Sequence, residues 1–252
     1  MTSPPHIQFS NVTVRYGDHV ALQDISLAIP ENQIFGIIGP ANSGKTSFLK
    51  CINRMLDFVP TARVAGDIRI RGDRVQAMRN VYRLRRRIGM VFPLPVGLPM
   101  SVYENVAYAP RQSGLHDRDA LDELVERCLR QAMLWDEVKD RLDLLGTKLS
   151  GGQQQRLTIA RALSHQPEIL CLDEFSIAID PVTTMKIEDM LVELKKNMTI
   201  VLVTNLVQQA RRLADQTAFF NDSRLVEIAD TETIFTQPEN PLTHEYVTGG
   251  FG

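Results

Sequence analysis

The chain has 252 residues, 44% of them hydrophobic, and 28 basic against 30 acidic side chains give a formal net charge of −2. This length allows one substantial α/β core, or a core with a small appended subdomain. The near balance of charge excludes the strong basic bias that is typical of a nucleic-acid-binding surface. Cys51, Cys128 and Cys171 are far apart and lack metal-ligand spacing, so we expect buried thiols in a reducing compartment.

The ends and apolar runs of the chain give no targeting or membrane signal. The segment Met1–Pro5 has neither a basic region nor an apolar region, so we expect no signal peptide. No apolar run approaches the roughly 18 residues that would cross a bilayer. Any association with a membrane should therefore come through partner proteins.

The first part of the chain is predicted to begin with β-structure. Residues 7–14 and 20–29 have the composition of strands, and Tyr16-Gly17-Asp18 is the expected turn between them. Residues 34–38 form a short apolar run, which predicts a buried strand that opens into a glycine loop at Gly39. A helix is expected from about Lys45 to Met55.

The middle of the chain is expected to be helical. Residues 93–99 are rich in proline and cannot form regular structure, so they mark the entry to a different region. Between Asp117 and Asp140 apolar residues recur every three or four positions, which indicates an amphipathic helix. The positions that form this pattern are Leu121, Leu124, Val125, Cys128, Leu129 and Met133.

The last third alternates strands with helices. Residues 169–172 and 199–203 are predicted buried strands, helices are expected at about 183–195 and 207–214, and short strands at about 217–227. Strands that alternate with helices favour a parallel sheet.

The glycine loop after residue 38 fits the phosphate-loop pattern GxxxxGK[ST]. Glycines let backbone N–H groups face an anion, and the positive end of the following helix adds to the attraction. We expect Lys45 to reach the β- and γ-phosphates of ATP and the Thr46 hydroxyl to bind Mg²⁺. The alternative is an ordinary glycine-rich turn. The expected ATP-binding residues are Gly39, Pro40, Ala41, Asn42, Ser43, Gly44, Lys45, Thr46 and Ser47.

Two carboxylates end the predicted strand at 169–172. Asp173 could hold the Mg²⁺ shell through water, and Glu174 could orient the attacking water as a catalytic base. Acidic residues often end strands, so the two carboxylates alone are weak evidence for a catalytic site. The phosphate loop in the same chain makes this interpretation stronger.

A second anion-binding helix start is expected more than 100 residues later. Two glycines and a serine precede a predicted helix, which leaves backbone N–H groups free. An ordinary Ser-Gly helix cap is the alternative. The segment is Leu149, Ser150, Gly151, Gly152 and Gln153.

Three motifs together resemble the nucleotide-binding domain of ABC transporters: GPANSGKT at 39–46, LSGGQQQR at 149–156 and ILCLDE at 169–174. The resemblance covers nearly the whole chain. It implies an α/β fold with an ABC-type P-loop NTPase core, in which a mixed or parallel sheet with flanking helices joins an N-terminal antiparallel β part. The nucleotide-binding core would comprise 1–92 and 158–252, and an inserted helical subdomain with the signature would comprise 93–157.

The resemblance also implies partners and roles. In that family the serine-glycine signature of one subunit closes on the ATP held by the phosphate loop of the other. We therefore expect a head-to-tail dimer, with a second copy or a paralogue, that is peripheral at the cytoplasmic face of the membrane beside integral permease subunits. By the same resemblance Tyr16 stacks on adenine, although it could instead cover a sheet edge. No nucleic-acid partner is expected.

A closer resemblance is to the phosphate-import ATPases. It implies a phosphate-translocating ATPase and, indirectly, an extracytoplasmic phosphate-binding protein. None of the segments that carry it contacts cargo in that family. They lie at 51–55, 84–92, 101–108, 134–140, 217–220 and 246–252.

The chain departs from the family at two catalytic positions. Pro93 stands where the family has a glutamine that reaches the Mg²⁺ and the attacking water. Asn205 stands where the family has a histidine that contacts the γ-phosphate. Proline has no side-chain amide, and asparagine cannot shuttle a proton. Smaller departures are Phe175, the loop 176–180 and Asn42, which tolerates left-handed backbone angles.

These departures leave ATP binding in place and predict slow hydrolysis. Three functions stay open: the energy-coupling subunit of a phosphate importer, an ATP-dependent regulatory or scaffold subunit, and the slow half of a heterodimer whose partner site is completed by this chain's signature. A DNA-maintenance ATPase is disfavoured because no sustained heptad pattern is present.

Overall fold

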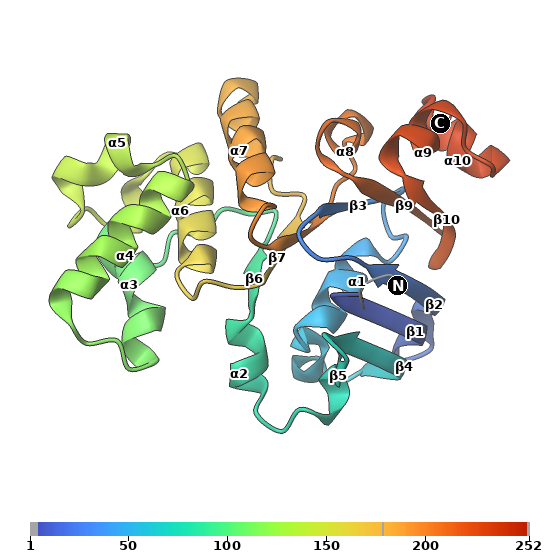
Figure 1. Ribbon diagram of the computed structural model, residues 1–252, viewed down its shortest axis with the longest axis horizontal. Helices are drawn as coiled ribbons and strands as arrows, with labels where there is room; N and C mark the ends of the chain where they lie inside the picture. Colours follow the sequence, from blue (N-terminus) through green and yellow to red (C-terminus); the bar gives the residue numbers. More distant parts are fainter. Residues whose placement is uncertain (1–4, 178, 251–252) are drawn as a thin grey trace.

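The N-terminal part of the protein is an antiparallel sheet. The computed structural model describes residues 5–177 and 179–250. Most of the Met1–Pro5 segment, Ala178 of the loop 176–180 and the end of the 246–252 segment lie outside the described residues. The sheet has the order β2-β1-β4-β5 (Figure 1). Its strands are β1 Ile7–Tyr16, β2 His19–Ile29, β4 Ala62–Ile70 and β5 Asp73–Arg74.

The second sheet carries the core. Its order is β10-β9-β3-β8-β7-β6, with β3 and β6–β9 parallel and β10 antiparallel to β9. Strands β3, β7 and β8 are buried along their whole length, because helices and the first sheet cover both faces. The predicted α/β architecture is therefore confirmed. The strands are β3 Ile34–Ile38, β6 Ile88–Val91, β7 Ile169–Asp173, β8 Thr199–Val203, β9 Gln216–Asn221 and β10 Arg224–Asp230.

Helices beside this sheet match the prediction in place but differ at their ends. Helix α1 stops at Ile52 rather than near Met55, because Arg54 takes a left-handed conformation (φ 57°) and a 3₁₀ turn follows. Helix α7 begins two residues early, with Pro181 in its first turn and Asp180 as its N-cap. The helices here are α1 Lys45–Ile52, α2 Val81–Arg86, α7 Pro181–Leu194, α8 Val207–Leu213, α9 Thr231–Thr236 and α10 Pro241–Val247.

Four helices gather at one end of the molecule, away from the N-terminal sheet (Figure 1, green to yellow). They are α3 Val102–Gln112, α4 Arg118–Gln131, α5 Trp135–Val138 and α6 Gly151–Leu163. The predicted apolar face of α4 is buried, with one exception. Met133 is 47% exposed and left-handed (φ 53°), because the helix ends at Gln131, so its assignment to the apolar face was wrong.

The expected boundary at residue 157 falls inside α6, which runs on to Leu163. One apolar cluster also joins both sides of this boundary: Val106 and Leu124 of the helical part share it with Leu170 and Ile200 of the sheet. The helical subdomain at 93–157 therefore stays a proposal, and its core is continuous with that of the sheet.

The structure also bears on the expectations for membrane-spanning helices and for the three cysteines. Within residues 5–177 and 179–250, no helix is long and apolar enough to span a membrane. Cys51, Cys128 and Cys171 are buried and free, and burial raises the pKa of each thiol, that of Cys128 to about 11.

Candidate functional site

The loop between β3 and α1 has a backbone shape that only glycine allows at two positions. Gly39 (φ 150°) and Gly44 (φ 98°) lie in the left-handed region. A Cβ at Gly39 would lie 2.0 Å from the Phe220 carbonyl oxygen, and one at Gly44 would lie 2.2 Å from that of Ala21. Asn42 also has a positive φ, 63°, which asparagine tolerates better than most residues. The loop thus curls as a phosphate loop requires.

Lys45 is held directly over this loop. Its Nζ donates to the carbonyl oxygens of Gly39 and Pro40, each at 2.7 Å. Burial lowers the pKa of the ammonium, while the nearby Glu174 and Asp173 raise it. The side chain is therefore a charged donor with limited access to water, at the place where a phosphate would meet the loop.

Thr46 and Asp173 bring the loop and the end of β7 together. The Thr46 hydroxyl donates to Asp173 Oδ2 at 2.9 Å. Burial raises the pKa of Asp173, and the Thr46 hydrogen bond and the charges of Lys50 and Lys45 oppose this rise. Asp173 Oδ1 and Ser43 Oγ are buried without a hydrogen-bond partner. Such orphaned oxygens fit a bound cation and phosphate, because a buried polar atom is costly without a partner.

The oxygen atoms of Thr46 and Asp173 suit magnesium better than a metal ion that is coordinated by protein side chains alone. Among residues 5–177 and 179–250, no group of three or more His, Cys, Asp or Glu side chains could hold an ion. Mg²⁺ is commonly held by one or two protein oxygens together with substrate phosphates and waters. Thr46 and Asp173 could supply such oxygens.

A cavity of about 490 Å³ lies beside the loop. Tyr16 lines it from the end of β1, and its hydroxyl is 3.0 Å from Ser47 Oγ. Glu174 lines the same cavity with a left-handed backbone (φ 45°). His19 and Ala21, which sequence reasoning missed, also line it, and their place just after the Tyr16 turn was the available signal. The other lining residues are Ala41, Asn42, Ser43, Gly44, Lys45, Thr46 and Ser47.

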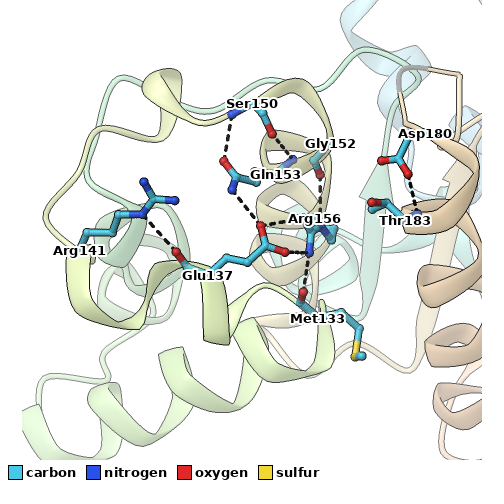
Figure 2. A network of polar contacts seen from close by, with 9 residues as sticks. All are labelled: Met133, Glu137, Arg141, Ser150, Gly152, Gln153, Arg156, Asp180 and Thr183. Atoms are coloured by element: carbon cyan, nitrogen blue, oxygen red, sulfur yellow. Dashed lines mark hydrogen bonds and ion pairs between the residues drawn. The ribbon is translucent and has the colours of Figure 1, made fainter.

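The serine-glycine segment starts α6, as predicted, and lies outside this cavity. Ser150 is the N-cap: its Oγ accepts from the Gln153 N–H, and the Gln153 side chain accepts from the Ser150 N–H (Figure 2). None of the residues 149–153 lines the cavity at the phosphate loop. Within one chain, the two predicted anion sites are therefore not brought together.

A charged pair that sequence reasoning missed supports this helix start. Arg156 is buried on α6 and donates to the Met133 carbonyl oxygen (2.6 Å) and to Glu137 Oε1 (2.7 Å). Gln153 donates to Glu137 Oε2 at 2.8 Å, so α5 is tied to the capping residue of α6 (Figure 2). The Arg156 hydrogen bond is the main reason that the pKa of Glu137 is lowered.

Replacing Glu137 by glutamine should lower the free energy of unfolding by about 1 kcal/mol at pH 7, because Arg156 stays buried while the carboxylate is only partly screened by water. Since the pKa of Glu137 is lower in the folded state, its contribution is present above the ordinary value of 4.5 and is lost as the pH falls below it.

Urea unfolding at pH 7 and pH 3 measures this difference. Glu126→Gln is the matched control, because Glu126 has the same exposed fraction of 43% and pairs with Arg130 on α4. Equal effects of the two substitutions at pH 7 would contradict the prediction.

The two departures from the family pattern also lie outside the cavity. Pro93 follows β6, and the preceding Phe92 carbonyl oxygen accepts from the Gln155 side chain at 3.2 Å. Gln155 Oε1 is buried without a partner. Asn205 is exposed just beyond the end of β8. Neither position supplies a side chain to the cavity at the phosphate loop.

Comparison with known proteins decides the family. The sequence pattern of the family described as ABC transporter matches residues 22–176, which is more than half of the chain. The chain belongs to the ABC transporter family. This match includes the phosphate loop, the signature segment and Glu174, and it identifies the chain as an ABC ATPase domain, the ATP-binding part of such a transporter. It does not distinguish importers from exporters.

Solved structures agree with this assignment. The ATP-binding cassette MJ0796, in a dimeric post-hydrolysis state bound to ADP and Pi, is 28% identical with a TM-score of 0.78, over 89% of this chain and 98% of that one. The structure of cbiO1 from Clostridium perfringens, described as part of the ABC transporter complex cbiONQ, is 24% identical with a TM-score of 0.82, over 93% and 92%. A bacterial Atm1-family ABC exporter with ATP bound is 22% identical with a TM-score of 0.82, and the match spans all of this chain but 43% of the exporter.

Proposed function

We propose that this ABC ATPase domain is the energy-coupling subunit of an importer, and that its ATP site is the cavity beside the phosphate loop. The observation that carries the ATP site is a buried charged group together with two oxygens that lack partners around that loop. Lys45 presents a buried ammonium, while Asp173 Oδ1 and Ser43 Oγ lack partners. A triphosphate with Mg²⁺ supplies the missing charge and ligands. Glu174 then orients the attacking water, and Tyr16 stacks on the adenine.

The proposed working form is a head-to-tail dimer. The N-terminus of α6 is the second predicted anion site, and none of its residues lines the cavity at the chain's own phosphate loop, so a second subunit is needed to use it. The dimeric state of MJ0796 supports this arrangement. The cbiONQ complex, of which cbiO1 is part, supports assembly with further transporter subunits, here permease subunits at the cytoplasmic face of the membrane.

Inorganic phosphate is the proposed cargo. The support is the resemblance of six segments to the phosphate-import ATPases. Partner subunits would bind the phosphate, and an extracytoplasmic binding protein would deliver it. Transport of labelled phosphate by membranes that contain the assembled transporter tests this part, and uptake of another solute in its place would overturn it.

Replacing Lys45 by alanine tests the ATP site itself. We expect the affinity for Mg-ATP to fall about 10- to 100-fold, because a charge-assisted contact to phosphate is lost. Lys196→Ala is the control, since Lys196 is 62% exposed, pairs with Glu193 and does not line the cavity. Equilibrium binding of a fluorescent ATP analogue measures both variants. Unchanged affinity in Lys45→Ala would place the nucleotide elsewhere.

A second candidate function follows from Pro93 and Asn205. The chain could close on ATP without appreciable turnover, either as a regulatory or scaffold subunit or as the slow half of a heterodimer with an active paralogue. An intact signature beside altered catalytic positions favours the heterodimer, because Ser150 and its neighbours would complete the partner's site. Strict self-pairing in co-purification would count against that form.

A further inference from the structure

A buried glutamine joins the two segments that lead into the candidate site. Gln209 lies on α8 and is 1% exposed. Its Oε1 accepts from the Thr204 hydroxyl at 2.9 Å, and its Nε2 donates to Ser176 Oγ and to Glu188 Oε1, each at 3.1 Å. One side chain thus connects the loop after β7, the end of β8 and helix α7.

Two of the connected segments carry a candidate site residue. Ser176 lies two residues after Glu174, whose N–H donates to the Val203 carbonyl oxygen at 2.8 Å. The Thr204 hydroxyl also accepts from the Leu206 N–H at 3.0 Å, and so closes the turn that presents Asn205. The Gln209 amide therefore contacts the segments of both residues without lining the cavity at the phosphate loop.

The network is anchored from outside by an ion pair. Arg212 donates from Nε to Glu188 Oε2 at 2.9 Å and from Nη2 to Glu188 Oε1 at 2.7 Å. This two-point contact fixes the orientation of the buried Glu188 carboxylate, whose Oε1 also accepts from Gln209. The amide of Gln209 is thus held between a fixed acceptor and two hydroxyl groups, with all of its hydrogen-bonding atoms used.

We propose that Gln209 is a positioning residue that keeps the Glu174 loop and the Asn205 turn in one relative arrangement. Its effect on hydrolysis rests on the proposed ATPase function, whereas its effect on the two segments does not. Buried networks whose members are all satisfied favour a single arrangement, and mutations within them couple distant groups.

A glutamate at position 209 would test the need for an amide donor. The charged side chains that face this position are Glu188 of α7 and, behind it, Arg212 of α8, while Ser176 and Thr204 are neutral. Two carboxylates at hydrogen-bond distance repel unless they share a proton, which raises one of their pKa values. Only the protonated form can donate as the amide does. Gln209→Glu should therefore lose activity at alkaline pH and regain it at about pH 6.

The experiment compares Gln209→Leu and Gln209→Glu with Gln208→Leu and Gln208→Glu, because Gln208 is the exposed neighbour on the same helix. Single-turnover ATP hydrolysis and Mg-ATP affinity are measured at pH 6 and pH 8. We expect about tenfold slower hydrolysis in Gln209→Leu at both pH values and in Gln209→Glu at pH 8 only, with affinity unchanged within about twofold. The Gln208 variants should match the native chain.

Amide hydrogen exchange is the second readout, and it does not depend on hydrolysis. Gln209→Leu should speed exchange in residues 174–177 and 204–206 together and leave the phosphate loop unchanged. If the native chain does not hydrolyse ATP, the proposed function fails and this readout still decides the role of Gln209. Native-like hydrolysis in Gln209→Leu, or in Gln209→Glu at pH 8, would overturn the inference, and so would exchange that changes in one segment only or in neither.

Discussion

Replacing Glu174 by glutamine is expected to lower ATP turnover about 100- to 1000-fold. The Glu174 side chain lines the cavity together with Lys45 and Thr46, and its left-handed backbone is held by a hydrogen bond to Val203. In the proposed mechanism its carboxylate orients the attacking water and accepts a proton. Glutamine has the same size but cannot take up that proton.

Binding should survive this substitution, because the phosphate contacts come from the loop and not from Glu174. The affinity for Mg-ATP is therefore expected to stay within about threefold of the native value. Glu193→Gln is a suitable control, since Glu193 is 69% exposed on α7 and pairs only with Lys196 among the described residues. A variant that keeps native turnover would remove Glu174 from the mechanism, and one that loses ATP binding would assign it a different role.

Restoring the two family residues should have the opposite effect. We expect the double variant Pro93→Gln/Asn205→His to raise turnover about 10- to 100-fold, because it returns one group for the water and one for the γ-phosphate. The gain in turnover of the double variant should not equal the product of the gains of the two single variants, since the two groups act on the same transition state. Steady-state phosphate release measures all three variants.

The control for this gain in turnover is Pro95→Gln, because Pro95 is a second proline of the same irregular segment. It alters the backbone freedom of the segment without placing an amide at position 93. If Pro95→Gln raises turnover as much as Pro93→Gln does, flexibility and not the side-chain amide is responsible. A double variant with native turnover would show that these positions do not limit hydrolysis.

Motifs that are local in sequence could be predicted well. The run at 34–38, the glycine loop and Lys45 form one continuous strand–loop–helix segment, so their geometry follows from neighbouring residues. The runs that became β7 and β8 are short, apolar and fully buried, which makes them clear signals for a parallel sheet. The placement of Asp173 at the loop follows from that topology.

Features that depend on tertiary packing could not be predicted in the same way. Only Ile68 and Ile70 of strand β4 are buried, and Ala65 and Gly66 interrupt the alternation of apolar and polar residues that marks a strand. Helix α6 crosses the predicted boundary because Leu157 and Leu163 join the core shared with the sheet. Arg156 also contacts Glu137, 19 positions away in sequence, and Gln209 contacts Ser176, 33 positions away, and nothing in this spacing predicts either contact.

We propose that this chain binds ATP normally and hydrolyses it slowly, and measuring both quantities on the native protein tests this proposal. Mg-ATP affinity and steady-state turnover should be determined in parallel, beside Glu174→Gln and Pro93→Gln/Asn205→His. We expect normal Mg-ATP binding and low turnover in the native protein, and a clear gain in turnover in the double variant. Brisk native turnover that only Glu174→Gln abolishes would contradict the proposal and would make this chain an ordinary transport ATPase.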